Sequence, residues 1–406
     1  MEVDLATKVL RYAFLTLFVT LFAVPSAAFT WFKYAVFGVL GVSLILFIIK
    51  HREHVDIPKS ILLSLSLVCI AVALGLVVAL IRETFRPDTL FELRSFGLIV
   101  FEVFAGTVVV RARIVKWEEL AKLFVLAVVI YSFLKLFFLI FVYFYPLQGI
   151  ALKTLLFPDA FMGGYVLLDG FYRLVAVNDY YLPAAYVVAG LANLEERKSL
   201  AVRIVLLFFV FISFSRFLWL ETAALIVVVS WFSNRKLFTP RRVLGAVAAL
   251  LVVLTLAQLL GADIIGTFRV RFVTEGGLSL NYKFAQIRVL TEEFLKYPVF
   301  GKGLGSTVER FPKRWKLKTG WETFAVGYSY EVFNFLLLVQ FGVVGSLLLA
   351  AGVYAPIFAV PDKKKRIFVF LCVSAFLASG FTNPVIINAP TGLFMCLWYG
   401  FSQEVR

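Results

Sequence analysis

The sequence predicts a polytopic α-helical membrane protein, because of its composition and its recurring apolar runs. Of its 406 residues, 62% are hydrophobic, and the mean hydropathy of +0.93 is far above that of soluble domains. Apolar runs of roughly 15–25 residues recur along the chain, and each is long enough to cross or nearly cross a bilayer as a helix. The first run leads directly into a second, so we interpret it as a retained span and not as a cleaved signal peptide.

We expect about 12 spans in one membrane domain that covers the whole chain. The expected spans are residues 9–29, 31–49, 61–81, 95–110, 123–145, 181–193, 204–232 as two short helices, 243–260, 331–359 and the two runs that flank 380–392.

The gaps between these runs indicate their orientation. Lys and Arg are concentrated in residues 50–59, 111–122, 194–203, 234–242 and 361–366. Cytoplasmic loops carry such an excess, and one orientation in the cytoplasmic (inner) membrane satisfies all five gaps, with both termini cytoplasmic. The net charge of +15 is then explained by topology and by contact with membrane lipid, without a nucleic-acid partner.

The run at 204–232 is interrupted by the sequence SFSRF, which contains Ser215 and Arg216. Basic gaps lie on both sides of this run, so both of its ends should be cytoplasmic. We therefore expect two short helices with Ser215 and Arg216 at their extracytoplasmic tip. The alternative is one long span with Arg216 buried at its centre, which would cost several kcal/mol.

Two segments are expected on the extracytoplasmic side, a smaller one at 146–180 and a large loop at 261–330. In the large loop, Phe284, Ile287, Leu290 and Phe294 recur at helical spacing. They predict an amphipathic helix on the outer membrane surface or on the top of the helix bundle. Its end is followed by YPVFGKGLGS, whose three glycines favour a tight, close-packed turn over a nucleotide-binding loop. Backbone N–H groups there could still cradle an anion.

The extracytoplasmic cations point to an anionic substrate, since the positive-inside rule does not require cations on that side. Arginine binds phosphate in a bidentate manner, and pyrophosphate is the natural anion of lipid-linked intermediates. The candidate pyrophosphate ligands are Arg216, Arg173, Arg271 and Lys302. The alternatives are solvated or headgroup-facing arginines at 173, 269 and 271, and for Arg216 a snorkelling side chain or a partner for Glu221.

A candidate general base is Glu331, at the start of an apolar run. It could take a proton from a sugar hydroxyl that attacks an anomeric carbon, or it could be a first-turn acid placed by the helix dipole. The only histidines are His51 and His54, and all three cysteines lie in apolar runs. We therefore expect neither a metal site nor a cofactor. Glu102 and Lys135, inside apolar runs, are interpreted as internal polar contacts.

Four stretches together resemble the O-antigen ligase and O-antigen polymerase superfamily of polytopic membrane glycosyltransferases. They are FISFSRFLWLETAALIVVV (211–229), YPVFGKGLGS (297–306), YSYEVFNFLLLVQFGVVG (328–345) and the TNP of 382–384. The resemblance implies a fold like that of the C-type glycosyltransferases and an extracytoplasmic active site. It also implies that arginines at the positions of Arg216 and Arg173 hold the pyrophosphate of a polyprenyl-linked oligosaccharide, which is moved without metal onto a glycan acceptor. A chain-length regulator protein is a candidate partner.

Ligases of this superfamily carry a histidine where this chain has Glu331. This difference favours a polymerase over a ligase, with Glu331 in place of the histidine as the base. A transporter or flippase for lipid-linked glycans is the alternative from another class, because about 12 spans suit it equally. A membrane scaffold would explain neither the extracytoplasmic arginines nor the large loop.

Overall fold

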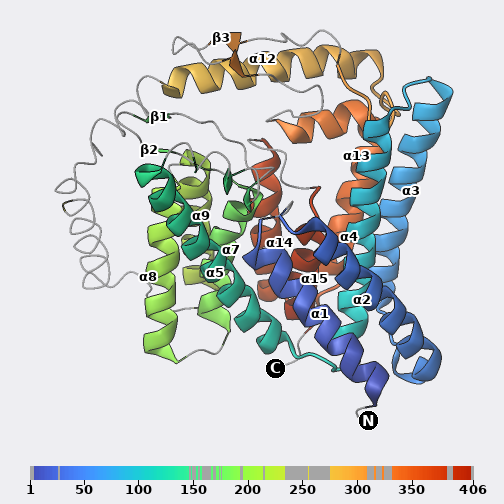
Figure 1. Ribbon diagram of the computed structural model, residues 1–406. Coiled ribbons are helices and arrows are strands. Elements are labelled where there is room, and N and C mark those ends of the chain that lie inside the picture. The colour runs from blue at the N-terminus through green and yellow to red at the C-terminus, as the bar shows by residue number, and fades with distance from the viewer. Residues whose placement is uncertain are drawn as a thin grey trace. The chain divides into compact units, whose positions relative to one another are not determined.

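The computed structural model describes most of the chain and is almost wholly helical, with two short antiparallel strand pairs (Figure 1). The described residues are 4–25, 28–145, 148, 152–153, 156–157, 166–167, 171–172, 174, 176–192, 195–213, 215–233, 255, 275–308, 315–316, 322–323, 332–381 and 387–403. Within them, six helices are long and apolar enough to cross a membrane. This is consistent with the multi-pass α-helical membrane protein that the sequence predicts. The expected span at 243–260 lies outside the described residues.

The chain divides into two compact units, and unit 1 comprises Met1–Val55 and Val109–Gly276. Its described elements are α1 (Leu5–Ala23), α2 (Thr30–Lys50), η1 (Arg52–His54), α5 (Trp117–Phe144), β1 (Val166–Leu167), β2 (Phe171–Tyr172), η2 (Val177–Tyr181), α7 (Leu182–Leu191), α8 (Glu196–Ile212) and α9 (Arg216–Ser233). The helices α1, α2 and α5 match expected spans. α5 begins six residues before the expected start at 123, because Glu118 and Glu119 in its first turn favour helix at its positive end.

Polar contacts join the N-terminal part of α1 to the first turn of α5 and to the end of α2. Arg11 Nη2 lies 2.8 Å from Glu119 Oε1. Asp4, the N-cap of α1, pairs with Lys50 and His51. The hydrogen bond from Lys50 is the largest of the effects that hold the pKa of Asp4 well below its usual range. α1 and α5 therefore begin at the same end of unit 1, as the predicted alternation of spans requires.

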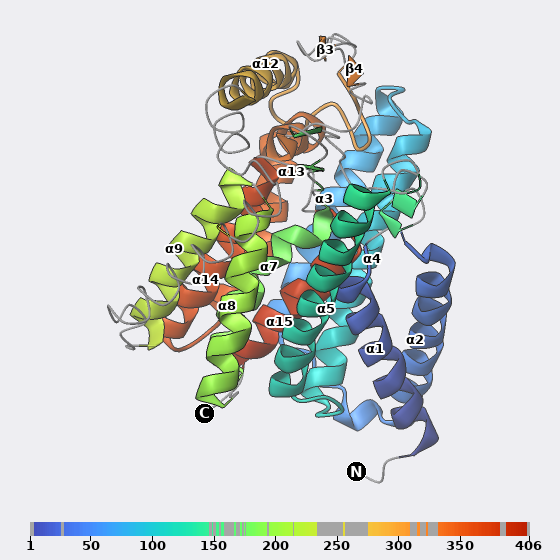
Figure 2. The same cartoon turned by 60° about the vertical axis from the view of Figure 1, so that its left-hand side comes forward.

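The centre of unit 1 is α7, whose first eight residues are all buried. It packs against α5, α8 and α9 (Figure 2). The segment before it, η2, is fixed to the end of α1, since Asn178 Nδ2 donates to the carbonyls of Leu21 and Phe22, each at 3.0 Å. These two hydrogen bonds satisfy carbonyls that have no intrahelical donor at the end of α1.

Unit 2 comprises Asp56–Val108 and Gly277–Arg406. Its elements are α3 (Lys59–Ile81), α4 (Pro87–Arg111), α12 (Glu275–Lys296), β3 (Trp315–Lys316), β4 (Glu322–Thr323), α13 (Phe333–Phe358), α14 (Lys363–Ala378), η4 (Ser379–Phe381) and α15 (Pro390–Gln403). The expected start of the fourth span at 95 is wrong, because α4 begins at Pro87. A proline fits the first position of a helix, where no intrahelical donor is needed, and the apolar residues Leu90, Phe91 and Leu93 continue the turn.

The amphipathic segment of the predicted large loop forms α12, which packs against the start of α13 (Figure 1). Its buried face differs in part from the predicted one. Leu290 is fully buried in a cluster with residues of α13, as expected, but Phe284 is 64% exposed. The polar residues Gln286 and Glu293 are buried instead. Both find partners there, with Gln286 Oε1 accepting from Val332 N at 3.3 Å and Glu293 pairing with lysines.

The glycine turn, residues 297–307, docks into a break in α13. At Gly342 the backbone leaves the helical region with φ 61°. Two N–H groups of the turn then donate to α13 (Lys302 N to Val339 O at 2.7 Å, Gly303 N to Gln340 O at 3.0 Å), and two of its carbonyls accept from α13 (Val343 N to Pro298 O at 2.8 Å, Val344 N to Val299 O at 3.0 Å). Turn and helix thus supply each other's missing hydrogen bonds, which confirms the prediction of a close-packed turn.

Three glycines make this docking sterically feasible. Gly301, Gly303 and Gly305 have φ values of 73°, 109° and 75°, a region that residues with a side chain rarely adopt. A Cβ on Gly303 would lie 2.5 Å from Ala79 Cα of α3. Leu304 N donates to Gly75 O of the same helix at 2.9 Å. Because other groups of the turn bond to α13, the turn is wedged between α3 and α13.

We expect Gly303→Ala to lower the free energy of unfolding by at least about 3 kcal/mol, through the strained φ and the collision with Ala79. Gly97→Ala is the matched control, because a Cβ at Gly97 of α4 would meet nothing within 4 Å. The control should be neutral or more stable by up to about 1 kcal/mol. Denaturant unfolding in detergent measures both, and equal stability of the two variants would contradict the docked turn.

Candidate functional site

The interrupted run of unit 1 forms two helices, α8 and α9, which are separated at 213–215. Trp219 Nε1 of α9 donates to Val210 O of α8 at 2.9 Å. In one continuous helix these residues would be roughly 13 Å apart along the axis, beyond the reach of an indole. The chain therefore turns back at this point, and α8 and α9 lie side by side (Figure 2). This arrangement confirms the predicted pair of short helices over the single long helix.

Arg216 is the first residue of α9 and is half-buried. Ser215, before it, is the last residue outside the helix, and its carbonyl accepts from Trp219 N at 3.1 Å. No acidic residue lies in the first turn of α9. An arginine thus stands at the positive end of a helix dipole, and both a guanidinium group and that end favour an anion.

Glu221, five residues further along α9, points to the buried face of the helix. It is only 5% exposed, and its neighbours on that face, Leu218 and Leu225, are buried as well. Its Oε2 atom has no hydrogen-bond partner among the described residues. A carboxyl group in such a place is costly, and in a membrane protein it is a candidate for function.

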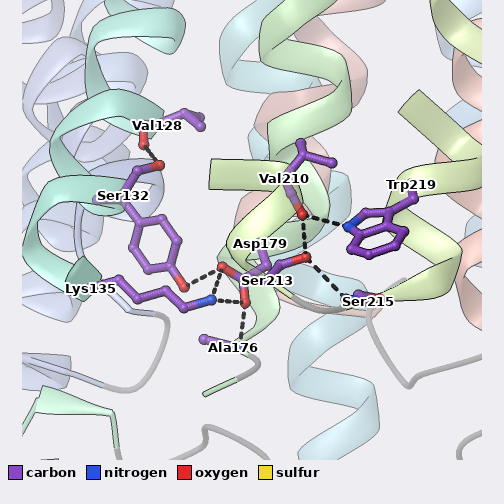
Figure 3. A network of polar contacts seen from close by, with 10 residues as sticks. Val128, Ser132, Lys135, Ala176, Asp179, Val210, Ser213, Ser215 and Trp219 are labelled. Carbon is purple, nitrogen blue, oxygen red and sulfur yellow. Dashed lines mark hydrogen bonds and ion pairs between the residues drawn. The ribbon is translucent and has the colours of Figure 1, made fainter. Parts of the chain in front are cut away.

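A buried ion pair joins α5 to η2 close to this turn (Figure 3). Lys135 Nζ lies 2.8 and 2.7 Å from the two carboxylate oxygens of Asp179. Tyr131 Oη donates to the same carboxylate at 3.0 Å, and so does Ala176 N at 3.0 Å. Asp179 is fully buried, and these bonds satisfy both of its oxygens. The pair fixes the segment that leads into α7, and α7 in turn packs against α8 and α9.

Sequence reasoning did not find this pair. An internal contact is expected for Lys135, but nothing in the sequence assigns its partner, which lies 44 residues away. The available signal is the presence of two isolated opposite charges in apolar surroundings, since buried charges require partners.

Glu102 has a comparable role within unit 2. It is fully buried on α4, and its Oε2 accepts from Leu393 N in the first turn of α15 at 3.1 Å. A Cβ on Gly392 would collide with the Glu102 side chain. Glu102 therefore caps α15 from another helix, which confirms the internal contact expected from the sequence.

Lys302, a predicted pyrophosphate ligand, lies in unit 2 and connects α12 to the glycine turn. Its Nζ is 2.7 Å from Glu293 Oε1 and 3.0 Å from Thr307 O. Lys296 Nζ lies 2.6 Å from the other oxygen of Glu293. Burial acts to raise the pKa of Glu293, but the hydrogen bonds and charges of Lys296 and Lys302 outweigh it, so that this pKa is lowered.

The structure thus places two of the five predicted site residues, Arg216 in unit 1 and Lys302 in unit 2. The other three, Arg173, Arg271 and Glu331, lie outside the described residues, as does Arg269. Over the described part of the chain, no group of three or more His, Cys, Asp or Glu side chains gathers at a spacing that could hold a metal ion.

Replacing Lys135 by Met should lower the free energy of unfolding by about 3–5 kcal/mol, because the Asp179 carboxylate would stay buried without its cation. The double variant Lys135→Met, Asp179→Leu should regain most of this loss. Denaturant unfolding of the two variants measures the effect. A double variant as unstable as the single one would show that the pair does not account for the loss.

The lowered pKa of Glu293 predicts a pH dependence. Ionised Glu293 stabilises the fold above its ordinary pKa of 4.5, and this contribution is lost as the pH falls below that value toward the lower pKa of the folded state. Glu293→Gln should therefore reduce the thermal midpoint at pH 7, and the difference from the parent should shrink below pH 4.5. Glu292→Gln, in an exposed pair with Arg288, should change stability by less than about 0.5 kcal/mol at either pH. A constant difference for Glu293→Gln across the pH range would contradict this prediction.

No protein-family model matches the chain, and no curated protein matches it.

Proposed function

We propose that the protein is a polymerase-type glycosyltransferase that moves a polyprenyl-pyrophosphate-linked oligosaccharide onto a sugar hydroxyl at the outer face of the cytoplasmic membrane. The observation that carries this proposal is the position of Arg216 at the first residue of α9, at a turn between two short helices. A guanidinium group and a helix N-terminus together suit a pyrophosphate group. The resemblance of residues 211–229, 297–306 and 328–345 to the polymerase and ligase superfamily supports the same function.

The topology of the proposal follows the basic gaps in the sequence. About 12 spans, with both termini cytoplasmic, place the turn before Arg216 on the extracytoplasmic side. Within unit 1, the N-terminal part of α1 contacts the first turn of α5 and the end of α2, in agreement with that alternation. In unit 2, α12 packs against the start of α13, as a segment of the loop before that helix would.

The proposed reaction is a direct displacement at the anomeric carbon. The acceptor hydroxyl oxygen forms a bond to that carbon while the bond to the pyrophosphate oxygen breaks. The leaving polyprenyl pyrophosphate keeps the electron pair, and Arg216 stabilises its negative charge. Arg173, Arg271 and Lys302 are the further candidate ligands for this group. Glu331 takes the proton of the hydroxyl as general base, so that the displacement inverts the anomeric centre and uses no metal.

The existing contacts of Lys302 limit its part in this scheme. Its ammonium group is bound by Glu293 and by the carbonyl of Thr307, and its side chain is only 16% exposed. A pyrophosphate could recruit Lys302 only by competing with these contacts. Arg216 is therefore the described residue on which the proposal depends.

A transfer assay in liposomes tests the proposal. The purified chain is given a polyprenyl-pyrophosphate-linked oligosaccharide without metal, and we expect a ladder of products. Arg216→Ala should reduce the rate at least about 100-fold, the scale for loss of one charge-stabilising group in a transition state. Glu331→Gln should abolish transfer and leave donor binding unchanged. Arg288→Ala is the control, since Arg288 is an exposed residue of α12 paired with Glu292, and it should transfer at the parent rate.

The other outcomes of this assay decide between the alternatives. A single transfer that requires an added acceptor would indicate a ligase. An unchanged donor that crosses the bilayer would indicate a transporter and would overturn the proposal, as would full activity of Arg216→Ala.

A further inference from the structure

The carbonyl of Val210, in the last turn of α8, accepts two side-chain hydrogen bonds. Ser213 Oγ donates to it at 2.6 Å, and Trp219 Nε1 donates at 2.9 Å from α9 (Figure 3). The carbonyls of a last helical turn have no intrahelical donor and require other partners. The two side chains therefore end α8 and bring the start of α9 back against it.

The indole of Trp219 is held in a second way. Its ring stacks on that of Phe211 with a centroid distance of 5.3 Å and an interplanar angle of 3°. The hydrogen bond fixes the edge of the indole, and the stacking fixes its face. A rotation or tilt of α9 relative to α8 would disturb both contacts. We name the set of Val210, Phe211, Ser213 and Trp219 the indole clamp.

The turn between the helices also contains a hydrogen bond of its own, from a backbone N–H to a side-chain hydroxyl. Ser215 N donates to Ser213 Oγ at 3.2 Å, so that the hydroxyl of Ser213 joins the end of α8 to the residue before Arg216. Ser213 and Ser215 are both buried. Ser213 therefore contacts both the end of α8 and the residue that precedes α9.

Arg216 and Trp219 are three residues apart on α9, so they are neighbours on one side of the helix. The indole clamp fixes the turn of helix that carries the guanidinium group. A group that stabilises a leaving pyrophosphate must be held within about 0.5 Å of its productive position. An apolar side chain at 219 would bury similar area, but it would supply no directional bond to α8.

We infer that Trp219 is a positioning residue, which sets the place of Arg216 through the indole clamp and so determines the affinity for the pyrophosphate group of the donor. The inference rests on the proposed function for its donor, and the clamp itself can be measured without any transfer activity.

The first experiment measures the clamp alone. Cys69, the exposed cysteine, is replaced by Ser, and a nitroxide label is placed on the chain by Arg216→Cys. In this background we expect the EPR spectrum of a restrained label. Trp219→Ala should make the label clearly more mobile. Trp219→Phe should give an intermediate mobility, because phenylalanine keeps an aromatic ring but lacks the N–H. Trp231→Phe is the matched control, since Trp231 lies near the other end of α9 and is 46% exposed. The control should leave the spectrum unchanged, and unchanged mobility in both Trp219 variants would overturn the inference.

The second experiment measures the effect on the donor, in the chain with Arg216 intact. Trp219→Phe should raise the KM for the polyprenyl-pyrophosphate donor about fivefold, the scale of one hydrogen bond, with the KM for the acceptor unchanged. Ser213→Thr, which keeps a hydroxyl for Val210 O, should stay near the parent value, whereas Ser213→Ala should resemble Trp219→Phe. Equal changes in the donor and acceptor KM values would show a purely structural role and overturn the inference. If the parent chain transfers no glycan, the proposed function fails, and the mobility of the label still decides whether the clamp positions residue 216.

Discussion

The exchange of four backbone hydrogen bonds between the glycine turn and α13 is the constraint on which unit 2 depends. A helix broken at Gly342 leaves N–H and C=O groups unpaired, and in an apolar environment each unpaired group costs several kcal/mol. The turn supplies them, but only if its backbone reaches that of α13 and α3, which explains the positive φ angles of Gly301, Gly303 and Gly305. The buried Glu92 of α4 reinforces the junction, since it accepts from Gly305 N at 3.1 Å and from Gln340 Nε2 at 2.9 Å. A segment that the sequence predicts as a loop is therefore a structural part of the helix bundle.

Buried ionisable side chains fix further contacts in each unit. Lys135 and Asp179 join α5 to η2, and Glu102 joins α4 to the start of α15. Such groups are expensive to bury, and their pairing gives little net stability compared with an apolar core. Their effect is directional, because a charge accepts only partners with suitable geometry, whereas apolar surfaces can slide against one another. In unit 1 this places η2 and α7, and α7 packs against the two helices that meet at Arg216.

The candidate site shows how far sequence reasoning reaches. The interruption at SFSRF and the position of Arg216 at a helix start follow from the cost of an arginine inside an apolar run. Trp219 carries no such signal, since a tryptophan in an apolar run is ordinary; its bond to Val210 depends on the angle at which α9 returns to α8. Lys302 stands out as a cation beside glycines, yet its contact with Glu293 depends on where α12 ends relative to the turn. The roles of Arg173, Arg271 and Glu331 stay predictions, because these residues lie outside the described part of the chain.

Local chemistry along the chain is enough to specify the class of the protein and, to within six residues at either end, the helices α1, α2, α3, α5 and α13. It also specifies the break between α8 and α9 and the tight turn at the three glycines. These features follow from apolar length, charge at helix ends and the backbone freedom of glycine. The partners of the polar groups depend instead on the packed fold. The inward face of α12 carries Gln286 and Glu293 because the start of α13 and the turn offer them hydrogen bonds. The free energy of these bonds outweighs what the burial of the exposed Phe284 would contribute. The Lys135–Asp179 pair and the bonds between the turn and α13 also join residues that are far apart in the chain. No local sequence pattern predicts which of several polar groups will form such a contact.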